Sequence, residues 1–233
     1  MAYDAVIIGS GFGGAFTALA LVEAGLRVVL LERGEPVARD DDDWSPRRIL
    51  LEGRYAGPSP IQVRQYGASS PSPLHPMQML GGNSVLYGGA SLRLRPTDMD
   101  HWPLDYADLE PHYSAAETHL TVHGVQGEDP HEPPRSSDFT SPPVALTAPA
   151  QRIHRAASAL GWRPFRLPMA INFSDPTRPR CILCNTCDGY PCRIEAKNDL
   201  TTTVLQAAVD AGLQIRAGAA VGEIEMMSGR ARG

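Results

Sequence analysis

The sequence lacks the features that would direct the chain to a membrane or to nucleic acid. No apolar run approaches the roughly 18 residues that a membrane-spanning helix needs, and no basic segment precedes the first apolar run as it would in a signal peptide. The net charge is −5, with Lys and Arg spread along the chain, so nucleic acid is not an expected partner. We therefore expect a cytoplasmic protein without a membrane span.

The composition is nevertheless that of a folded protein. The 233 residues suffice for one or two domains, and 42% of them are hydrophobic, which provides enough apolar surface for a core and excludes disorder of the whole chain. The 22 glycines and 21 prolines predict that much of the length lies in loops. An acidic run at residues 40–43 predicts a solvated surface loop.

The first 32 residues have the pattern of a βαβ unit. Residues 5–8 form an apolar, β-branched run that predicts a strand buried on both faces, and residues 15–24 predict a helix that ends at Gly25. Residues 28–31 predict a second buried strand. This order indicates an α/β fold with a parallel sheet.

Three glycines and one acid occupy the positions of a dinucleotide-binding fingerprint. Gly9 permits a tight turn, Gly11 lets the backbone approach a pyrophosphate, and Gly14 permits close packing of helix and strand. Glu32 ends the second strand, where a carboxylate accepts hydrogen bonds from ribose hydroxyls and disfavours a 2′-phosphate, which argues against NADP. The alternative is a glycine-rich turn without a ligand. The fingerprint fits NAD and FAD alike, and its place near the N-terminus favours a flavoprotein.

A second glycine-rich segment follows at residues 80–91. Gly81, Gly82, Asn83 and Ser84 precede two apolar residues, and Gly88 and Gly89 come shortly after. Backbone without Cβ atoms can lie against a planar ligand or a phosphate. The alternative is a loop that only turns the chain.

Together the two segments resemble the glucose–methanol–choline (GMC) oxidoreductases, and most closely the cholesterol-oxidase-like and gluconate-dehydrogenase-like members. Residues 101–113 with Glu117 resemble the stretch that leads into the substrate domain of that family, and residues 195–198 and 220–224 resemble two later signatures. The resemblance implies that the chain is the N-terminal, FAD-binding portion of such an enzyme. The cofactor-binding residues that it implies are Gly9, Gly11, Phe12, Gly13, Gly14, Glu32, Arg33, Gly81, Gly82, Asn83, Ser84, Gly88, Gly89 and Val221.

Two details of this implied FAD site concern single residues. The resemblance implies that Val221 contacts the adenine through its backbone. The sequence departs from many relatives at Tyr87, where they carry Asn, so a flavin contact made by that amide does not transfer to this chain.

The resemblance also implies a domain organisation. We expect a Rossmann-like FAD-binding domain with a parallel sheet and a β-meander, and part of a second, irregular α+β substrate domain. Residues 1–120 are predicted as the first part of the FAD-binding domain, 121–180 as a Pro-rich linker and partial substrate or cap region, and 181–233 as a Cys-rich loop and an incomplete return to the FAD-binding domain.

All four cysteines cluster at Cys181, Cys184, Cys187 and Cys192. Spacing by two residues suits the thiolates of an iron–sulfur cluster. The ferredoxin run, however, has three residues before its last Cys and a Pro after it, whereas here four residues precede Cys192 and the Pro stands before it. Zinc usually takes two Cys pairs that are further apart. Structural thiols or disulfides that hold an irregular loop are the third possibility. We assign no metal ligand, and the alternatives stay open.

The expected chemistry is oxidation of the CH–OH group of an alcohol, sugar or sterol-like substrate by hydride transfer to the flavin, with an electron-acceptor protein as a candidate partner. The resemblance places the catalytic His pair beyond residue 233, so this chain has no assigned catalytic residue and is expected to be a truncated, inactive portion. None of its seven histidines lies on a motif that places it over a flavin. The alternatives are a nucleotide-binding subunit that needs a separate catalytic half, an iron–sulfur electron-transfer protein and an NAD dehydrogenase.

Overall fold

A computed structural model describes residues 2–67 and 69–231 of the chain. These residues form two compact units. The first contains the chain up to Tyr87, Asp188–Arg193 and the residues from Leu200 onward; the second contains Gly88–Cys187 and Ile194–Asp199. The division into domains at residues 120 and 180 remains a prediction, because compact units need not coincide with evolutionary domains.

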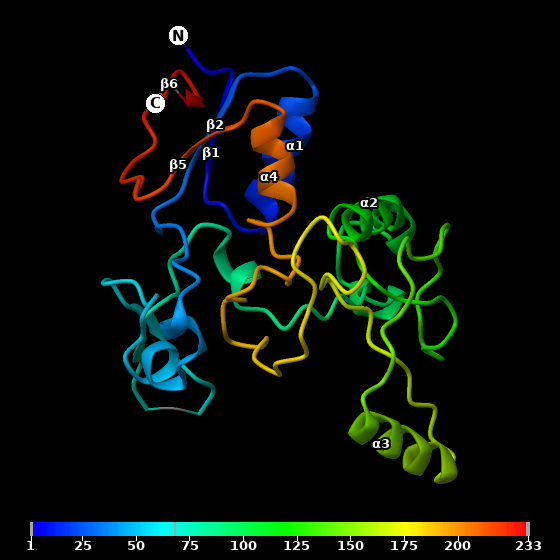
Figure 1. Ribbon diagram of the computed structural model, residues 1–233. Helices are drawn as coiled ribbons and strands as arrows, with labels where there is room; N and C mark the ends of the chain where they lie inside the picture. Colours follow the sequence, from blue (N-terminus) through cyan, green and yellow to red (C-terminus); the bar gives the residue numbers. More distant parts are fainter. Residues whose placement is uncertain (1, 68, 232–233) are drawn as a thin grey trace. The chain divides into compact units, whose positions relative to one another are not determined.

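The first unit is built on a three-stranded parallel sheet. Strands β1 (Ala5–Ile8), β2 (Val28–Leu31) and β5 (Gln214–Arg216) lie in the order β1-β2-β5 (Figure 1). Ile7 pairs with Leu30, and Leu30 with Ile215. The βαβ unit and the parallel sheet expected from the sequence are therefore confirmed.

Two helices of this unit pack against each other. They are α1 (Phe12–Glu23), which joins β1 to β2, and α4 (Val204–Asp210), which precedes β5 (Figure 1). Their buried faces are rich in alanine, and small side chains let two helix backbones approach closely. The buried residues are Ala15, Ala18, Leu19 and Val22 of α1 and Val204, Leu205 and Ala208 of α4.

The two apolar strands at the start of the chain differ in burial. Val28 of β2 is 1% exposed, whereas Val6 and Ile8 of β1 are 56% and 52% exposed. The reason is their place in the sheet, since β2 lies between two strands and β1 pairs only with β2. The expectation of a strand buried on both faces is therefore right for β2 and wrong for β1.

The remainder of the first unit is made of short elements. Asp41–Trp44 and Gly82–Val85 form 3₁₀ turns, and Arg47–Leu51 forms one π-helical turn. Two antiparallel hairpins join β3 (Ile61–Val63) to β4 (Ser72–Leu74) and β6 (Met226–Met227) to β7 (Arg230–Ala231).

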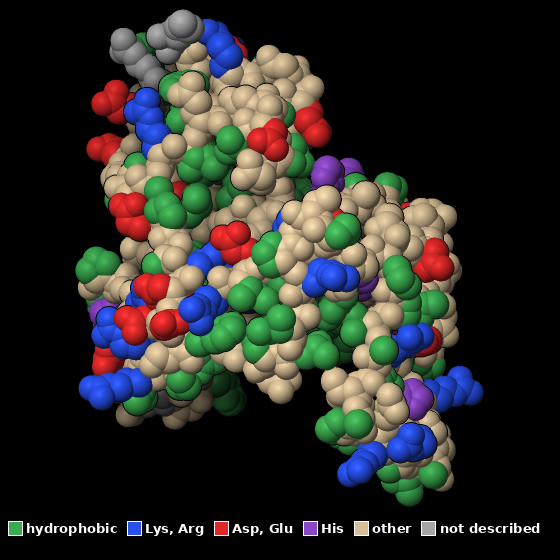
Figure 2. All heavy atoms as spheres, viewed as in Figure 1, with side chains coloured by type: hydrophobic (Ala, Val, Ile, Leu, Met, Phe, Trp, Pro, Cys, Tyr) green, Lys and Arg blue, Asp and Glu red, His purple; other side chains and the backbone are tan. Residues whose placement is uncertain are grey.

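The second unit has little regular structure. It contains a 3₁₀ turn at Pro96–Met99 and the helices α2 (Tyr106–His119) and α3 (Ala148–Ala159). Helix α3 has no buried residue and stands clear of the rest of its unit (Figure 1), with basic and apolar side chains on its surface (Figure 2). The mixture of polar side chains and Pro111 concealed α2 in the sequence.

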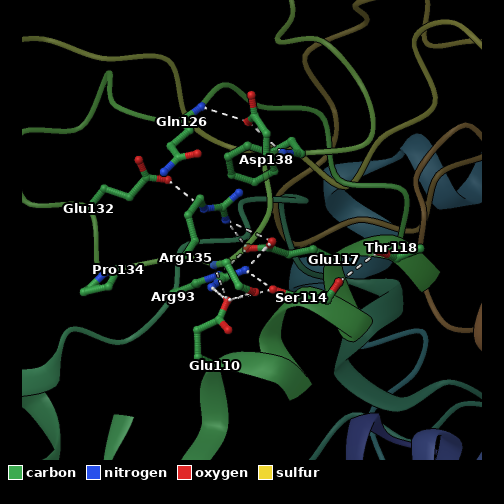
Figure 3. A network of polar contacts seen from close by, with 12 residues as sticks. Arg93, Glu110, Ser114, Glu117, Thr118, Gln126, Glu132, Pro134, Arg135 and Asp138 are labelled. Atoms are coloured by element: carbon green, nitrogen blue, oxygen red, sulfur yellow. Dashed lines mark hydrogen bonds and ion pairs between the residues drawn. The ribbon is translucent and has the colours of Figure 1, made fainter. Parts of the chain in front are cut away.

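A network of charged side chains holds α2 to the loops beside it (Figure 3). Arg93, whose side chain is 3% exposed, donates to both carboxylate oxygens of Glu117 at 2.7 Å and to Glu110 at 3.0 Å. Arg135 also donates to Glu117, at 2.8 Å, and its guanidinium lies 3.7 Å from the centre of the Phe139 ring. Within the second unit these ion pairs connect α2 to the loops that carry Arg93 and Arg135.

Among residues 2–67 and 69–231, no helix combines the length and the apolar character that crossing a membrane requires.

Candidate dinucleotide-binding site

A cavity of about 860 Å³ lies in the first unit, where β1 and β2 end. Ile8 and Gly9 form its wall at the end of β1, and Leu31 and Glu32 do so at the end of β2. Ligands of open α/β sheets bind at the carboxyl ends of the strands, and the volume is within the roughly 300–1,000 Å³ of small-molecule sites. The fold therefore places this cavity where a nucleotide site is expected.

The first glycine segment connects β1 to α1 in a tight turn. Gly9 has φ +92°, a backbone conformation that residues other than glycine rarely adopt. A Cβ on Gly14 would overlap the carbonyl oxygen of Gly9, so only glycine permits this approach of helix to turn. Gly11 precedes the first turn of α1, which has no acidic residue. The N–H groups and the dipole of α1 thus favour an anion at this end.

Glu32 is held by three donors of the protein. Its Oε2 accepts from the amide of Ser10 at 2.8 Å and from the Ser10 hydroxyl at 2.6 Å, and its Oε1 accepts from the amide of Gly34 at 2.8 Å. The residue is 7% exposed and lines the cavity. Hydrogen bonds of this kind fix the orientation of the carboxylate at the cavity wall.

The second glycine segment begins beside the first. Gly81 and Gly82 have φ +87° and +54°, and a Cβ on Gly82 would come within 3.3 Å of the Gly11 Cα. Gly82 and Asn83 line the cavity. The Ser84 hydroxyl donates to the Gly81 carbonyl at 2.7 Å and accepts from the Leu200 amide at 3.1 Å, so this side chain fixes the loop internally.

The structure brings part of the predicted site together. Seven of the predicted residues line the cavity: Gly9, Gly11, Glu32, Arg33, Gly82, Asn83 and Val221. Five others lie outside its lining but in the same unit: Phe12, Gly13, Gly14, Gly81 and Ser84. Gly88 and Gly89 belong to the second unit, where a Cβ on Gly89 would come within 2.8 Å of the Ile171 side chain. Their part in a cofactor site stays a prediction.

Some residues of the cavity wall were not predicted. The end of β4 contributes Leu74, and the segment that follows it contributes His75, Pro76, Met77 and Met79. The residues before Val221 contribute Ala219 and Ala220. The ring of His75 is oriented by a 2.7 Å hydrogen bond between its Nδ1 and the Gly57 carbonyl. The only signal in the sequence was the irregular, Pro-rich character of residues 53–76.

Tyr87, which departs from the family pattern, has an aromatic partner in the first unit. Its ring lies 5.9 Å from that of Phe12, at an interplanar angle of 80°. This edge-to-face contact connects the start of α1 to the end of the second glycine segment.

The four cysteines do not form a metal centre in this structure. The structure has them as thiols, with Cys181, Cys184 and Cys187 in the second unit and Cys192 in the first. Within the part of the chain that the structure describes, no three His, Cys, Asp or Glu side chains gather closely enough to hold a metal ion.

Comparison with known proteins identifies the class of this fold. Residues 4–62 match the family described as FAD dependent oxidoreductase. The chain is 34% identical to 6'''-hydroxyparomomycin C oxidase of Streptomyces lividus, over 87% of this chain and 38% of that protein, and 29% identical to cholesterol oxidase of Mycobacterium tuberculosis, over 91% and 38%. The crystal structure of pyridoxine 4-oxidase from Mesorbium loti has the same fold, with a TM-score of 0.60 at 19% identity, over 99% of this chain and 45% of that one.

The chain is therefore similar in sequence to FAD-dependent oxidoreductases and has the fold of one of them. Other relatives that match at least 98% of this chain are GMC-type oxidoreductases, so the resemblance seen in the sequence is confirmed: the chain fits a GMC-like FAD-binding portion. The chain spans about two fifths of the length of the curated relatives it matches.

The residues present fit the dinucleotide that this class implies. A Cβ on Gly11 would meet no atom within 4 Å, so the backbone there faces open space beside the start of α1. The Glu32 carboxylate and residues 219–221 line the same cavity. An anion-binding turn and a ribose-binding acid in one cavity are the donor set of a dinucleotide site.

Proposed function

We propose that this chain binds FAD in the cavity at the ends of β1 and β2, and that it serves as the FAD-binding part of an oxidoreductase that acts on the CH–OH group of an alcohol, sugar or sterol-like substrate. The observation that carries the proposal is that the Gly9–Gly11 turn, Glu32 and Val221 line one cavity. The names of the relatives, which include 6'''-hydroxyparomomycin C oxidase and cholesterol oxidase, support the choice of substrate class.

Each element of the cavity has its own task. The amides at the start of α1 bind the pyrophosphate, Glu32 accepts the ribose hydroxyls, and the backbone at Val221 lies along the adenine. Gly82 and Asn83 bring the second glycine segment against the cofactor on the opposite side of the turn. When bound, FAD supplies the hydride acceptor, whereas this chain binds and orients the cofactor.

Titration of the purified chain with FAD tests this function. We expect quenching of the flavin fluorescence with saturable binding, competition by ADP, and a higher unfolding temperature, because a ligand at about 100 times its Kd adds about 2.7 kcal/mol to the free energy of unfolding. NADP is the matched control, since Glu32 repels its 2′-phosphate. A chain that unfolds at the same temperature with and without FAD would contradict the proposal.

A second measurement concerns turnover. We expect that the FAD-loaded chain alone reduces no dye in the presence of alcohols, because none of its histidines is assigned as a base over the flavin. Clear alcohol-dependent reduction would show that the catalytic base lies within residues 1–233.

A further inference from the structure

Ser10, between the two glycines of the first segment, has a side chain with two defined partners. It is 0% exposed, and its hydroxyl donates to Glu32 Oε2 at 2.6 Å while accepting from the Gly81 amide at 2.8 Å. The single proton of the hydroxyl is therefore directed to Glu32 and one of its lone pairs to Gly81. No other residue type of similar size makes both bonds from this position.

The two bonds belong to a longer series that connects distant segments of the first unit. Glu32 accepts from the Gly34 amide at 2.8 Å, and Gly81 is tied by its carbonyl to the hydroxyl of Ser84, which accepts from the Leu200 amide. The series thus joins the end of β2, the first glycine turn, the second glycine loop and the segment before α4. Buried networks of this kind polarise and orient their members together.

We propose that Ser10 is a positioning residue that couples the ribose-binding carboxylate of Glu32 to the second glycine loop. Binding of the adenosine part of the cofactor at Glu32 thereby also affects the loop at Gly81. This inference rests on the proposed FAD-binding function. Ser10 is one of the residues that line the cavity, but its hydroxyl is engaged with Glu32 and Gly81 and the residue is 0% exposed, so we assign its effect to these two partners.

Substitution shows why a hydroxyl is required. In Ser10→Ala, Glu32 loses one of its three donors, and the Gly81 amide loses its acceptor in a buried place. A buried donor without a partner is costly, and hydrogen bonds to charged groups are among the strongest in proteins. The carboxylate is then less well oriented, and the Gly81 loop no longer responds to a ligand on the ribose side.

The affinity experiment uses the full chain with FAD and with ADP, which carries the adenosine diphosphate half alone. We expect Ser10→Ala to lower the affinity for both about 10-fold, whereas Ser45→Ala, outside the cavity in the same unit, leaves both unchanged.

The same affinities measured in a Glu32→Gln background distinguish a positioning role of Ser10 from a structural one. If Ser10 acts through Glu32, Ser10→Ala added to Glu32→Gln lowers the affinity less than twofold further. An equal loss in both backgrounds would overturn the inference.

Hydrogen exchange at the Gly81 amide gives a readout besides affinity. We expect ADP to slow this exchange in the parent chain and to leave it unchanged in Ser10→Ala, because the connection to Gly81 is lost. Ser10→Cys, nearly isosteric and a poor hydrogen-bonding partner, repeats the test if the alanine variant does not fold. A parent chain that binds neither FAD nor ADP refutes the proposed function. A parent that binds both, with a Ser10→Ala or Ser10→Cys variant of equal affinity, refutes the role of Ser10 alone.

Discussion

At the scale of single residues, two neighbouring glycines of α1 differ in what a methyl group would meet. A Cβ on Gly14 would overlap the Gly9 carbonyl oxygen, whereas a Cβ on Gly13 would meet no atom within 4 Å. We expect Gly14→Ala to destabilise the first unit by about 2 kcal/mol or more, because backbone must move to relieve the overlap. Thermal unfolding followed by circular dichroism measures the change.

Gly13→Ala is the matched control for that substitution. Alanine has a higher helix propensity than glycine, and Gly13 lies inside α1 without positive φ, so we expect the unfolding temperature to stay the same or to rise. Equal losses in the two variants would show that close packing at Gly14 is not what the turn requires.

Glu110 introduces a dependence of stability on pH. The Ser136 amide, the Ser114 hydroxyl and the Arg93 guanidinium hydrogen-bond its carboxylate and lower its pKa from 4.5 to about 2. A group with a lowered pKa in the folded state stabilises the fold above the unfolded value, and this contribution is lost as pH falls from about 4.5 to about 2. We expect acid unfolding of the second unit in this window, measured by circular dichroism.

Glu110→Gln tests the assignment of that acid transition. The amide keeps the size of the side chain but does not titrate, so the variant should be less stable at neutral pH and lose part of the dependence on pH below 4.5. A variant whose acid transition matches that of the parent in midpoint and slope would place the titrating group elsewhere.

The run Asp40 to Asp43 shows what a residue pattern leaves open. The sequence predicts a solvated loop, and the Asp41 side chain is 83% exposed, but Asp43 is fully buried. Its carboxylate accepts from the Arg39 amide at 2.8 Å and from the Tyr55 hydroxyl at 2.6 Å. Four identical residues in a row carry no information about which one finds buried donors, since those donors come from elsewhere in the chain.

At the scale of elements, Arg93 connects α2 to the loop that precedes it. Its ion pair with Glu117 is almost completely buried, with side chains 3% and 12% exposed. We expect Arg93→Met to destabilise the second unit by about 3 kcal/mol, the lower end for a broken buried pair, because Glu117 loses two charged hydrogen bonds and keeps only Arg135 as a partner. Urea unfolding monitored by circular dichroism gives the free energy.

Arg27→Met provides the comparison, because Arg27 also pairs with a carboxylate but on the surface. The side chains of Arg27 and Asp4 are 57% and 36% exposed, and water screens such pairs. We expect little change in the urea midpoint of this variant. A loss as large as that of Arg93→Met would mean that burial does not decide the strength of these ion pairs.

The elements that the sequence predicted well are those with local signals. Strands β1 and β2, helix α1 and the glycine turn are encoded within about 30 residues by apolar runs and by Gly9, Gly11 and Gly14. Helix α2 was missed because its capping pair Asp105 and Asp108 precedes a mixed polar surface without an apolar stripe. The exposure of Val6 and Ile8 in β1 was also missed, because the order of strands in a sheet is not a local property of the sequence.

At the scale of the whole molecule, the cysteine cluster is the largest question that the sequence raised. The cysteine spacing departs from the ferredoxin run and favours structural thiols, which leave the chain as stable with an iron chelator as without it, whereas an iron–sulfur cluster makes the stability depend on iron. Thermal unfolding with and without bipyridyl, on protein purified without oxygen, measures this. Brown, iron-containing protein that loses stability with bipyridyl would contradict the expectation and restore the iron–sulfur alternative.

The candidate site is also a property of the whole first unit. Its glycines and Glu32 were predicted because the fingerprint is contiguous, and Val221 because of a resemblance. The wall formed by residues 74–79 could not be predicted, since it depends on how a Pro-rich excursion returns to the cavity. The bond from Ser10 to Gly81 joins residues 71 positions apart, and no spacing rule anticipates it.

Helix α3 has a practical consequence for handling the protein. None of its twelve residues is buried, and Ile153 is 70% exposed, so little tertiary packing opposes local unwinding. A protease needs an unwound segment of chain, and Arg152 and Arg155 offer trypsin two cleavage points there. Brief digestion should therefore nick the chain in this helix before it cuts after the buried Arg93 or Arg135, and mass spectrometry of the fragments would identify the first cut.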